Sequence, residues 1–492
     1  MATLSAALNS MSGAITAFEN ALNVTQNNIA NAQTPGYVEQ TATFEPLPVD
    51  YSVSSGAAGA GGVISGPVVS ARNVYAENAV QQAQTTLGNW TQQLSTLQDL
   101  QNSFPVDGTS GIPGALNTLY SAFSSWAASP EDSNAQQAVI NGAQGLVQTF
   151  QQQANAVSTT AQTADNDLTS LVNQVNTLTG NIKQDNISLG TLGGATDPSV
   201  QADIYNNLEQ LSAIVPVTFI QQSDGTMEVL LDGQTPLVVG QTQYAISANV
   251  TVPTNPPPTY PSAAPTAQIL DSEGNDISSQ ISSGQIGGLL QAVNGTLAQI
   301  QGSASQQGSL NQLAQTVADT VNSILTSGNI SDANPTTGAP AVPGVPLFSY
   351  DATNPAGIAA SISLSPGITP GQLAAIDPGP PEVDNGIPLA LANLATPQTA
   401  ADEINGMSYN QFYGNIAGQL GTVISTAQSQ QQSSQETLTQ AQTLRQQNSG
   451  VDLNQEAIRV LQFQQSYDAA SKMVTVLDQV TQEFLDAIQL VQ

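Results

Sequence analysis

Four oxygen-bearing side chains lie close together in the sequence, at Asp271, Glu273, Asn275 and Asp276. Carboxylate and amide oxygens of this kind coordinate calcium, but their spacing departs from the twelve-residue calcium-binding loop and the glutamate that closes such a loop is missing. Asp and Asn also favour turns, because their side chains bond to nearby backbone amides. We therefore interpret this cluster as a turn, and the sequence predicts no metal site.

A dense glycine run, GAAGAGG, occupies residues 56–62. It is not followed by the Lys and Ser or Thr of a phosphate-binding loop, and no strand–loop–helix pattern surrounds it, so a flexible loop is the better interpretation. Two carboxylates at a suitable separation could hydrolyse a glycoside, but nothing singles out one pair among the 36 acidic residues. The sequence therefore indicates no catalytic residue and no cofactor site.

The composition excludes most other chemistry. The chain has no cysteine and no histidine, so thiolate chemistry and the commonest general base and metal ligand are missing. Five Lys and Arg residues against 36 Asp and Glu residues give a formal net charge of −31, which repels phosphate backbones and anionic lipid surfaces. We expect no enzymatic activity, no nucleic-acid partner and no membrane partner.

No ordinary export or membrane signal is evident in the sequence. The first basic residue is Arg72, whereas a secretory signal needs a basic segment near its start. No apolar run approaches the roughly 18 residues that a membrane span requires. We therefore expect a soluble chain without a cleavable signal peptide.

The elements that carry the clearest pattern lie at the two ends of the chain. Near the N-terminus, apolar residues recur at alternating steps of four and three, which predicts a helix with a narrow seam for a partner helix. This seam consists of Leu4, Leu8, Met11, Ile15, Phe18, Leu22, Thr25 and Ile29. Small residues flank it and allow another helix to approach closely.

The C-terminus repeats the same pattern. Its seam consists of Val460, Phe463, Tyr467, Ala470, Val474, Leu477, Thr481, Phe484, Ile488 and Val491. Asp452 followed by Gln455 is typical of a capping box, so the last helix should start near Leu453. We expect the first and last helices to pair antiparallel in one terminal domain, residues 1–45 and 450–492. Its thin core makes it marginal alone, so it should order fully among copies.

A distinctive turn follows the first helix. Asn28 and Asn31 end the apolar seam, and Thr34, Pro35, Gly36 and Tyr37 form the turn. Pro35 disfavours helix at the residue before it and Gly36 tolerates a positive φ, so the chain must leave the helix here, with Tyr37 anchoring the exit. We call residues 28–37 the signature turn.

Between the ends, the sequence predicts a long helical body interrupted by β inserts. Helical patterns cover residues 75–200, 286–325 and about 402–447, and we expect residues 46–204 and 285–449 to form a helical, rod-like core domain. β-rich runs separated by turn signals indicate an outward β-rich insert at 205–284. Residues 330–400, rich in Pro and Gly, should form a loop-rich insertion within the core domain. The fold class is mainly α with β inserts and coiled-coil-like terminal helices.

At these residues the chain resembles a known family. The stretch NNIANAQTPGYVEQ resembles the N-terminal signature of bacterial flagellar rod, hook and hook-associated axial proteins. The ending SGVDLNQEAIRVLQFQQSYDAASKMVTVLDQVTQEFLDAI resembles the first hook-associated protein family, FlgK, more closely than rod or hook proteins. Two features depart from that pattern: Glu39 stands where the family often has arginine, and residues 240–275 and 330–400 match poorly.

The resemblance implies a structural axial protein of the bacterial flagellum that forms the junction between hook and filament. It implies self-association into a ring, contacts with the hook protein and with a second junction protein, and an export chaperone. It also implies an extracellular location in the flagellum, reached through the flagellar type III export apparatus. Two alternatives remain open at this point: a hook or rod axial protein, and a secreted carbohydrate-binding or adhesive protein with a β-rich binding insert.

Overall fold

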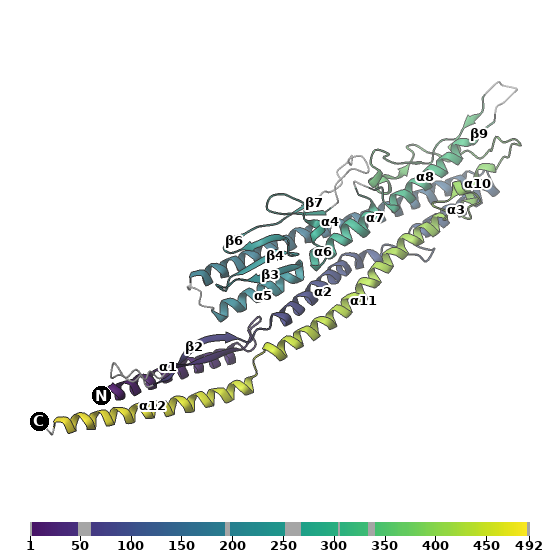
Figure 1. Cartoon of the computed structure of the whole chain (residues 1–492). Helices are drawn as coiled ribbons and strands as arrows, with labels where there is room; N and C mark the ends of the chain where they lie inside the picture. Colours follow the sequence, from purple (N-terminus) through teal and green to yellow (C-terminus); the bar gives the residue numbers. More distant parts are fainter. Residues whose placement is uncertain are drawn as a thin grey trace.

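The chain folds into an elongated molecule whose two termini lie at the same end (Figure 1). The computed structural model describes residues 2–47, 61–191, 197–250, 267–303, 306–332 and 340–489. The first helix, α1 (Ala2–Asn31), and the last, α12 (Leu453–Gln489), lie side by side and run antiparallel. The chain is mainly helical, with β inserts, which confirms the predicted fold class, and α12 begins at the predicted residue, with Asp452 accepting from the Asn454 amide.

A β-hairpin packs on the terminal helix pair. It consists of β1 (Gln40–Leu47) and β2 (Gly62–Ser70), which pair antiparallel. A Cβ on Gly13 would lie 3.2 Å from the carbonyl oxygen of Val63, so α1 and β2 are in close contact. The fully buried face of α1 is accordingly made of small or polar residues: Ser10, Ala14, Ala17, Ala21, Thr25 and Asn28.

This arrangement differs from the simple two-helix seam expected from the periodicity. Only small side chains let a helix approach a second helix and a hairpin at once, so most of the large seam residues lie at the edges of the contact. Phe44 of β1 lies between the two helices, with ring centroids 5.8 Å from Phe18 and 6.0 Å from Phe463. The terminal unit therefore has three components, not two.

The central body is built on long helices. The helix α2 (Val74–Gln101) runs alongside α11 (Tyr409–Ser449), and α3 (Gly111–Ala128) packs on α4 (Ser133–Thr191). With 59 residues, α4 is about 90 Å long and forms the backbone of the body. The helix α5 (Pro198–Ile214) returns along α4. One continuous hydrophobic core joins these helices to the segments described next.

Glycines allow one especially close crossing in this body. After α6 (Gly284–Leu290) the chain continues through a π-helical segment, Gln291–Leu297, and α7 (Ala298–Gln301), then breaks before α8 (Ser309–Ser327). A Cβ on Gly288 would lie 2.1 Å from the carbonyl oxygen of Asn89 on α2. The α2–α6 contact therefore tolerates no side chain at this position.

The β-rich insert lies directly on α4. Its sheet has the order β3 (Val217–Gln221), β4 (Met227–Leu231), β5 (Thr235–Val239) and β6 (Thr242–Gln243), and β7 (Ser247–Val250) pairs with β8 (Ala267–Leu270). The side chain of Asn186 on α4 donates to the carbonyl oxygens of Met227 and Gly240 and accepts from the amide of Met227. The insert shares its core with the helices, and the expected boundary at residue 205 falls inside α5.

The far end of the molecule is rich in loops and short elements. These are β9 (Asn329–Ser331), β10 (Val342–Pro343), β11 (Phe348–Ser349), α9 (Ile358–Ser361), β12 (Ser363–Leu364) and α10 (Gly386–Asn393). Three short 3-10 turns also lie here: Pro355–Gly357, Pro370–Gln372 and Ala400–Asp402. A fourth, Ser278–Gln280, lies beside β8 of the insert. Asn322 on α8 fixes one loop by accepting from the amides of Leu347 and Phe348.

Two of the segments singled out in the sequence can be compared with the structure. Asp271 accepts from the amides of Glu273 and Asn275, so this cluster is a turn. Most of the glycine run at 56–62 lies outside the described residues. Within the described ranges, no three His, Cys, Asp or Glu side chains are grouped as metal ligands. In those same ranges, no helix combines the length and apolarity needed to cross a bilayer.

The α2–α6 crossing gives a test of packing. We expect Gly288→Ala to lower the free energy of unfolding by about 2 kcal/mol, because its methyl group would press on the backbone of Asn89. Gly145→Ala in α4 is the control, because no atom lies within 4 Å of its Cβ position; alanine there should be neutral or stabilising by up to about 1 kcal/mol. Urea denaturation measures the stability of both variants. Equal stability would contradict the close contact between Gly288 on α6 and the backbone of Asn89 on α2.

A carboxyl group between α4 and α5 gives a pH-dependent test. Burial, with Asp203 nearby, raises the pKa of Asp185 from 3.8 to about 6. A raised pKa means that the group stabilises the fold below about pH 4 and that this contribution is lost as pH rises through about 6. Asp185→Asn should therefore stabilise the protein by about 1 kcal/mol above pH 6, after allowance for its partial exposure, and the gain should vanish near pH 4.

The matched control is Asp167→Asn, at an exposed position on the same helix. Denaturation curves at pH 4 and pH 7.5 measure both variants. A gain for Asp185→Asn that is the same at the two pH values would show that its ionisation does not oppose folding.

Candidate functional site

The terminal helices meet the central body in a compact polar region, which we call the joint. It comprises the signature turn, the loop and strand ends around Glu39 and Arg72, the start of α2, the end of α11 and the start of α12. Every ion pair among the described residues lies in the joint. Three of the chain's five basic residues, Arg72, Arg445 and Arg459, supply these pairs.

The signature turn has the geometry that its sequence predicts. The amide of Tyr37 donates to the carbonyl oxygen of Thr34 at 3.1 Å, and Gly36 has a φ of +77°, as in a type II turn with Pro35 before the glycine. The Thr34 hydroxyl donates to Oδ1 of Asn31. A Cβ on Gly36 would lie 2.4 Å from the carbonyl oxygen of Ala202, so the turn also packs tightly against α5.

Asn28 connects the first helix to three other segments. Its Nδ2 donates to the carbonyl oxygen of Gln40 and to Oε2 of Glu456, at 2.8 and 2.9 Å. Its Oδ1 accepts from the Tyr37 hydroxyl and from the Gln40 amide, at 2.9 and 3.0 Å. Asn28 has no solvent exposure, and both of its amide hydrogens and its oxygen are used. Burial and the nearby Glu456 raise the pKa of Tyr37 to about 12, so its hydroxyl remains a donor.

Glu456, the carboxylate that Asn28 contacts, is also completely buried. Arg459, one turn further along α12, binds both Glu456 and Glu39. Glu39 is further held by its backbone, which donates to the carbonyl oxygen of Ser449 at 3.0 Å. Glu39 thus has a partner within its own chain, at a position where the family pattern often has arginine.

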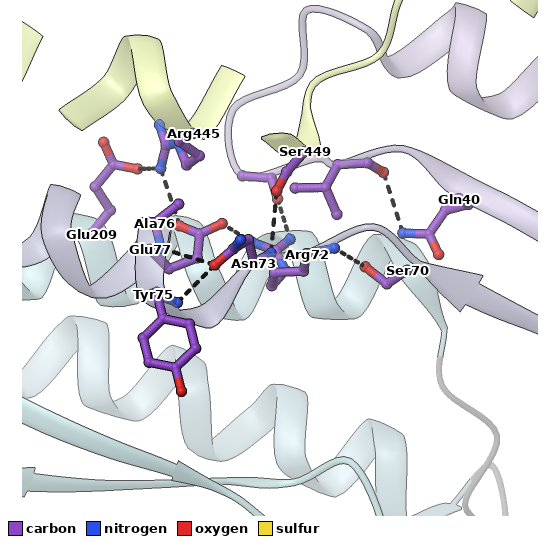
Figure 2. A network of polar contacts seen from close by, with 12 residues as sticks. Gln40, Ser70, Arg72, Asn73, Tyr75, Ala76, Glu77, Glu209, Arg445 and Ser449 are labelled. Atoms are coloured by element: carbon purple, nitrogen blue, oxygen red, sulfur yellow. Dashed lines mark hydrogen bonds and ion pairs between the residues drawn. The ribbon is translucent and has the colours of Figure 1, made fainter. Parts of the chain in front are cut away.

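A second ion-pair group lies on the side of the central body (Figure 2). Arg72 binds Glu77 and the carbonyl oxygen of Gly36, both at 2.6 Å, and its guanidinium lies 3.7 Å from the centre of the Tyr205 ring. Arg445 on α11 binds Glu77 and Glu209, at 3.3 and 2.6 Å. Burial lowers the pKa of Arg72 against the opposing effect of Glu77, yet an arginine remains charged. These bonds connect α2, α5, α11 and the signature turn.

The break between α11 and α12 is fixed from the same region. The Ser449 hydroxyl accepts from the amide of Asn73, and Asn73 in turn caps α2 by accepting from the amides of Tyr75 and Ala76 (Figure 2). Gly450 then leaves the helix in an extended conformation. The joint therefore sets the direction of the terminal helices relative to the body. It contains paired charges and filled hydrogen bonds, an arrangement suited to holding segments together.

The predicted assembly-seam residues are mostly half-buried within the single chain. This holds for Met11, Ile15, Phe18, Leu22, Val460, Phe463, Tyr467, Val474 and Leu477, whereas Leu8, Ile29 and Phe484 are exposed. The side chains of Leu4 and Ile488 lie outside the described residues. The structure brings Phe18 and Phe463 together through Phe44, and it leaves large apolar area on both helices uncovered.

The joint contains residues that the sequence analysis did not single out. Glu77, Glu209, Arg445 and Glu456 belong to no motif, and their positions are far apart in the chain. One signal was available in the sequence. Because the chain has only five basic residues and 36 acidic ones, each arginine could be expected to form an ion pair. The sequence does not say which of 36 acidic residues each arginine would meet.

Comparison with known proteins places this geometry in context. Residues 97–341 match the family described as flagellar hook-associated protein FlgK helical domain, and residues 440–487 match flagellar basal body rod FlgEFG protein C-terminal. The first of these matches spans about half of the chain.

Two relatives and one solved structure are similar to the chain. Flagellar hook-associated protein 1 of Salmonella typhimurium is 25% identical over 337 residues, which span 67% of this chain and 58% of that protein, less than two thirds of its length. The Bacillus subtilis protein of the same name is 22% identical over 517 residues, covering 96% of each. The flagellar hook junction protein FlgK from Burkholderia pseudomallei superposes with a TM-score of 0.61 at 16% identity, covering 75% of this chain and 99% of that chain, which shows a shared fold.

The role of the Asn28 side chain in joining α1 to three other segments can be tested with a nearly isosteric change. Asn28→Asp would place a second carboxylate against buried Glu456 and remove two donors, so we expect a loss of about 3 kcal/mol in the stability of the terminal helices. Hydrogen exchange of residues 2–31 measures that stability locally. The control is Asn31→Asp, one turn later and partly exposed, which should change exchange little. Equal rates of hydrogen exchange in the two variants would show that Asn28 does not hold the terminal helices in place.

Proposed function

The chain belongs to the FlgK family of flagellar hook-associated proteins, and on this premise we propose that it joins the hook to the filament as a structural protein of the flagellar axis. The observation that carries the proposal is the terminal unit. Both ends of the chain form long helices whose large apolar residues are only half-covered within one copy. Such helices gain stability by packing against further helices.

Self-association into a ring is part of the proposal. A repeated heterologous contact forms a ring when the rotation between neighbouring copies closes, and this requires the same fixed shape in each copy. The joint supplies this rigidity, because its ion pairs and hydrogen bonds fix the terminal helices to the central body. The hook protein and a second junction protein would then meet the ring from its two sides. An export chaperone that covers the apolar terminal seam would keep subunits apart before assembly.

A structural role also agrees with the chemistry of the described residues. The joint consists of paired charges, and the family to which the chain belongs is a structural one. We propose that the protein has no catalytic activity and lies outside the cell in the flagellum, after export through the flagellar type III apparatus. A hook or rod protein is not favoured, because the helical segment at 97–341 matches the FlgK family. No observation favours a carbohydrate-binding protein.

The test is a charge in the C-terminal seam. Leu477 is half-buried on α12, and Leu477→Asp would place a carboxylate where we propose that apolar helices meet. Burial of an unpaired carboxylate at a cost of about 3 kcal/mol would lower the fraction of docked subunits roughly a hundredfold. Cells that carry only this variant should have hooks without filaments, and folded variant and filament protein should appear in the medium. Electron microscopy and analysis of the medium measure both.

Gln479→Asp is the matched control, because residue 479 is an exposed polar position on the same helix. It should leave filaments and motility close to those of the unchanged protein. Normal filaments in cells carrying only Leu477→Asp would refute the seam as the assembly element.

A further inference from the structure

One aromatic side chain in the joint projects into solvent. Tyr75, in the first turn of α2, is 87% exposed, the largest exposure of any large hydrophobic side chain in the described residues. Val74, the residue before it, is also exposed. We call these two residues the Tyr75 patch. An exposed tyrosine among apolar residues is typical of a protein–protein contact, since tyrosine is enriched among residues that dominate binding energy.

A hollow of about 240 Å³ lies in the same joint. Its walls are the signature turn on one side and α2 and the end of α11 on the other: Ala32 to Val38, Glu77, Arg445, Gln446, Ser449 and Gly450. The walls are held by the Thr34–Tyr37 turn and by the Arg445 ion pairs. We call it the turn hollow. Its lining is mainly polar and includes Pro35, so it suits the hydroxyl tip of a tyrosine whose ring lies against the proline.

The Tyr75 patch and the turn hollow lie on opposite sides of the first turn of α2. Residues two positions apart in a helix are separated by about 200°, so Tyr75 and Glu77 point in opposite directions. Glu77 faces Arg445 and lines the turn hollow. Figure 2 shows the Tyr75 ring directed away from Arg445 and the end of α11.

The distribution of charge also favours the joint as the place where two copies meet. The chain carries a formal charge of −31, so two copies repel each other over most of their surfaces. In the joint, however, three arginines face four carboxylates, those of Glu39, Glu77, Glu209 and Glu456. With Asp452 at the start of α12, the joint has a formal charge of about −2 in a chain of −31, so two copies meet less repulsion here than elsewhere.

We propose that Tyr75 of one copy inserts into the turn hollow of the next copy. This contact rests on the proposed function, because it deepens the proposed self-association by naming its two surfaces. A projecting side chain on one side of the joint and a hollow on the other give a heterologous contact, which forms a ring when the rotation between copies closes. The signature turn then has two roles: it ends α1 within its own copy and receives the neighbour's tyrosine.

The absence of cysteine from the chain makes a cross-linking test direct. Asn78 is exposed one turn after Tyr75, and Gln33 is exposed at the turn hollow, so cysteines at both positions leave Tyr75 in place. Flagella isolated from cells that carry only the Asn78→Cys, Gln33→Cys double variant are treated with a short bismaleimide. We expect a ladder of covalent oligomers of the chain on a denaturing gel. Either single variant should give at most dimers.

The geometric control pairs Gln33→Cys with Thr86→Cys. Thr86 is exposed on α2 about 12 Å beyond Asn78, so this pair should give no ladder. Adding Tyr75→Ala to the double variant should reduce the ladder at least about tenfold, while the purified Tyr75→Ala protein unfolds at the same urea concentration as the unchanged chain.

The outcomes separate the two proposals. If the unchanged chain is missing from isolated flagella, the proposed function fails. If the Asn78→Cys, Gln33→Cys variant is present in the flagella without a ladder, or if Thr86→Cys, Gln33→Cys cross-links equally well, the Tyr75 contact is wrong and the proposed function stands. A ladder that is unchanged by Tyr75→Ala would also overturn the contact.

Discussion

The buried contact between Asn28 and Glu456 is the interaction on which the arrangement of the molecule depends. It joins the first and last helices across 428 positions of sequence, and neither side chain has solvent exposure. A buried carboxylate is tolerated only when its hydrogen bonds and charge are matched, here by Asn28 and Arg459. The two ends of the chain therefore form one unit, and everything between them is a single excursion that must leave and return through the joint.

The distribution of charge follows from this constraint. In a chain of strongly negative charge, basic residues are the scarce component, and three of the five are placed where the terminal unit meets the central body. The long helices and the β insert are held mainly by apolar packing in one core. Apolar packing is non-directional, whereas paired charges and filled amide groups require one geometry. The body is thus stabilised by burial, and its orientation is specified by the joint.

The terminal helices show why the structure of one copy points to assembly. Within one chain, α1 buries its small residues against α12 and the hairpin, and its larger residues remain half-covered. The proposed assembly would cover these half-buried residues. The rigid joint and the uncovered helices are complementary features, because repeated packing requires both a fixed shape and free surface.

The sequence alone determined the local features. The seam periodicity gave the two terminal helices, Asp452 gave the start of α12, and Pro35 with Gly36 gave the turn, because each depends on neighbours within a few residues. The tertiary structure decided which face of α1 is fully buried, that the β insert shares a core with α4, and which carboxylates Arg72, Arg445 and Arg459 bind. Periodicity marks an apolar face without naming what covers it, and an ion pair between distant residues depends on the path of the chain between them.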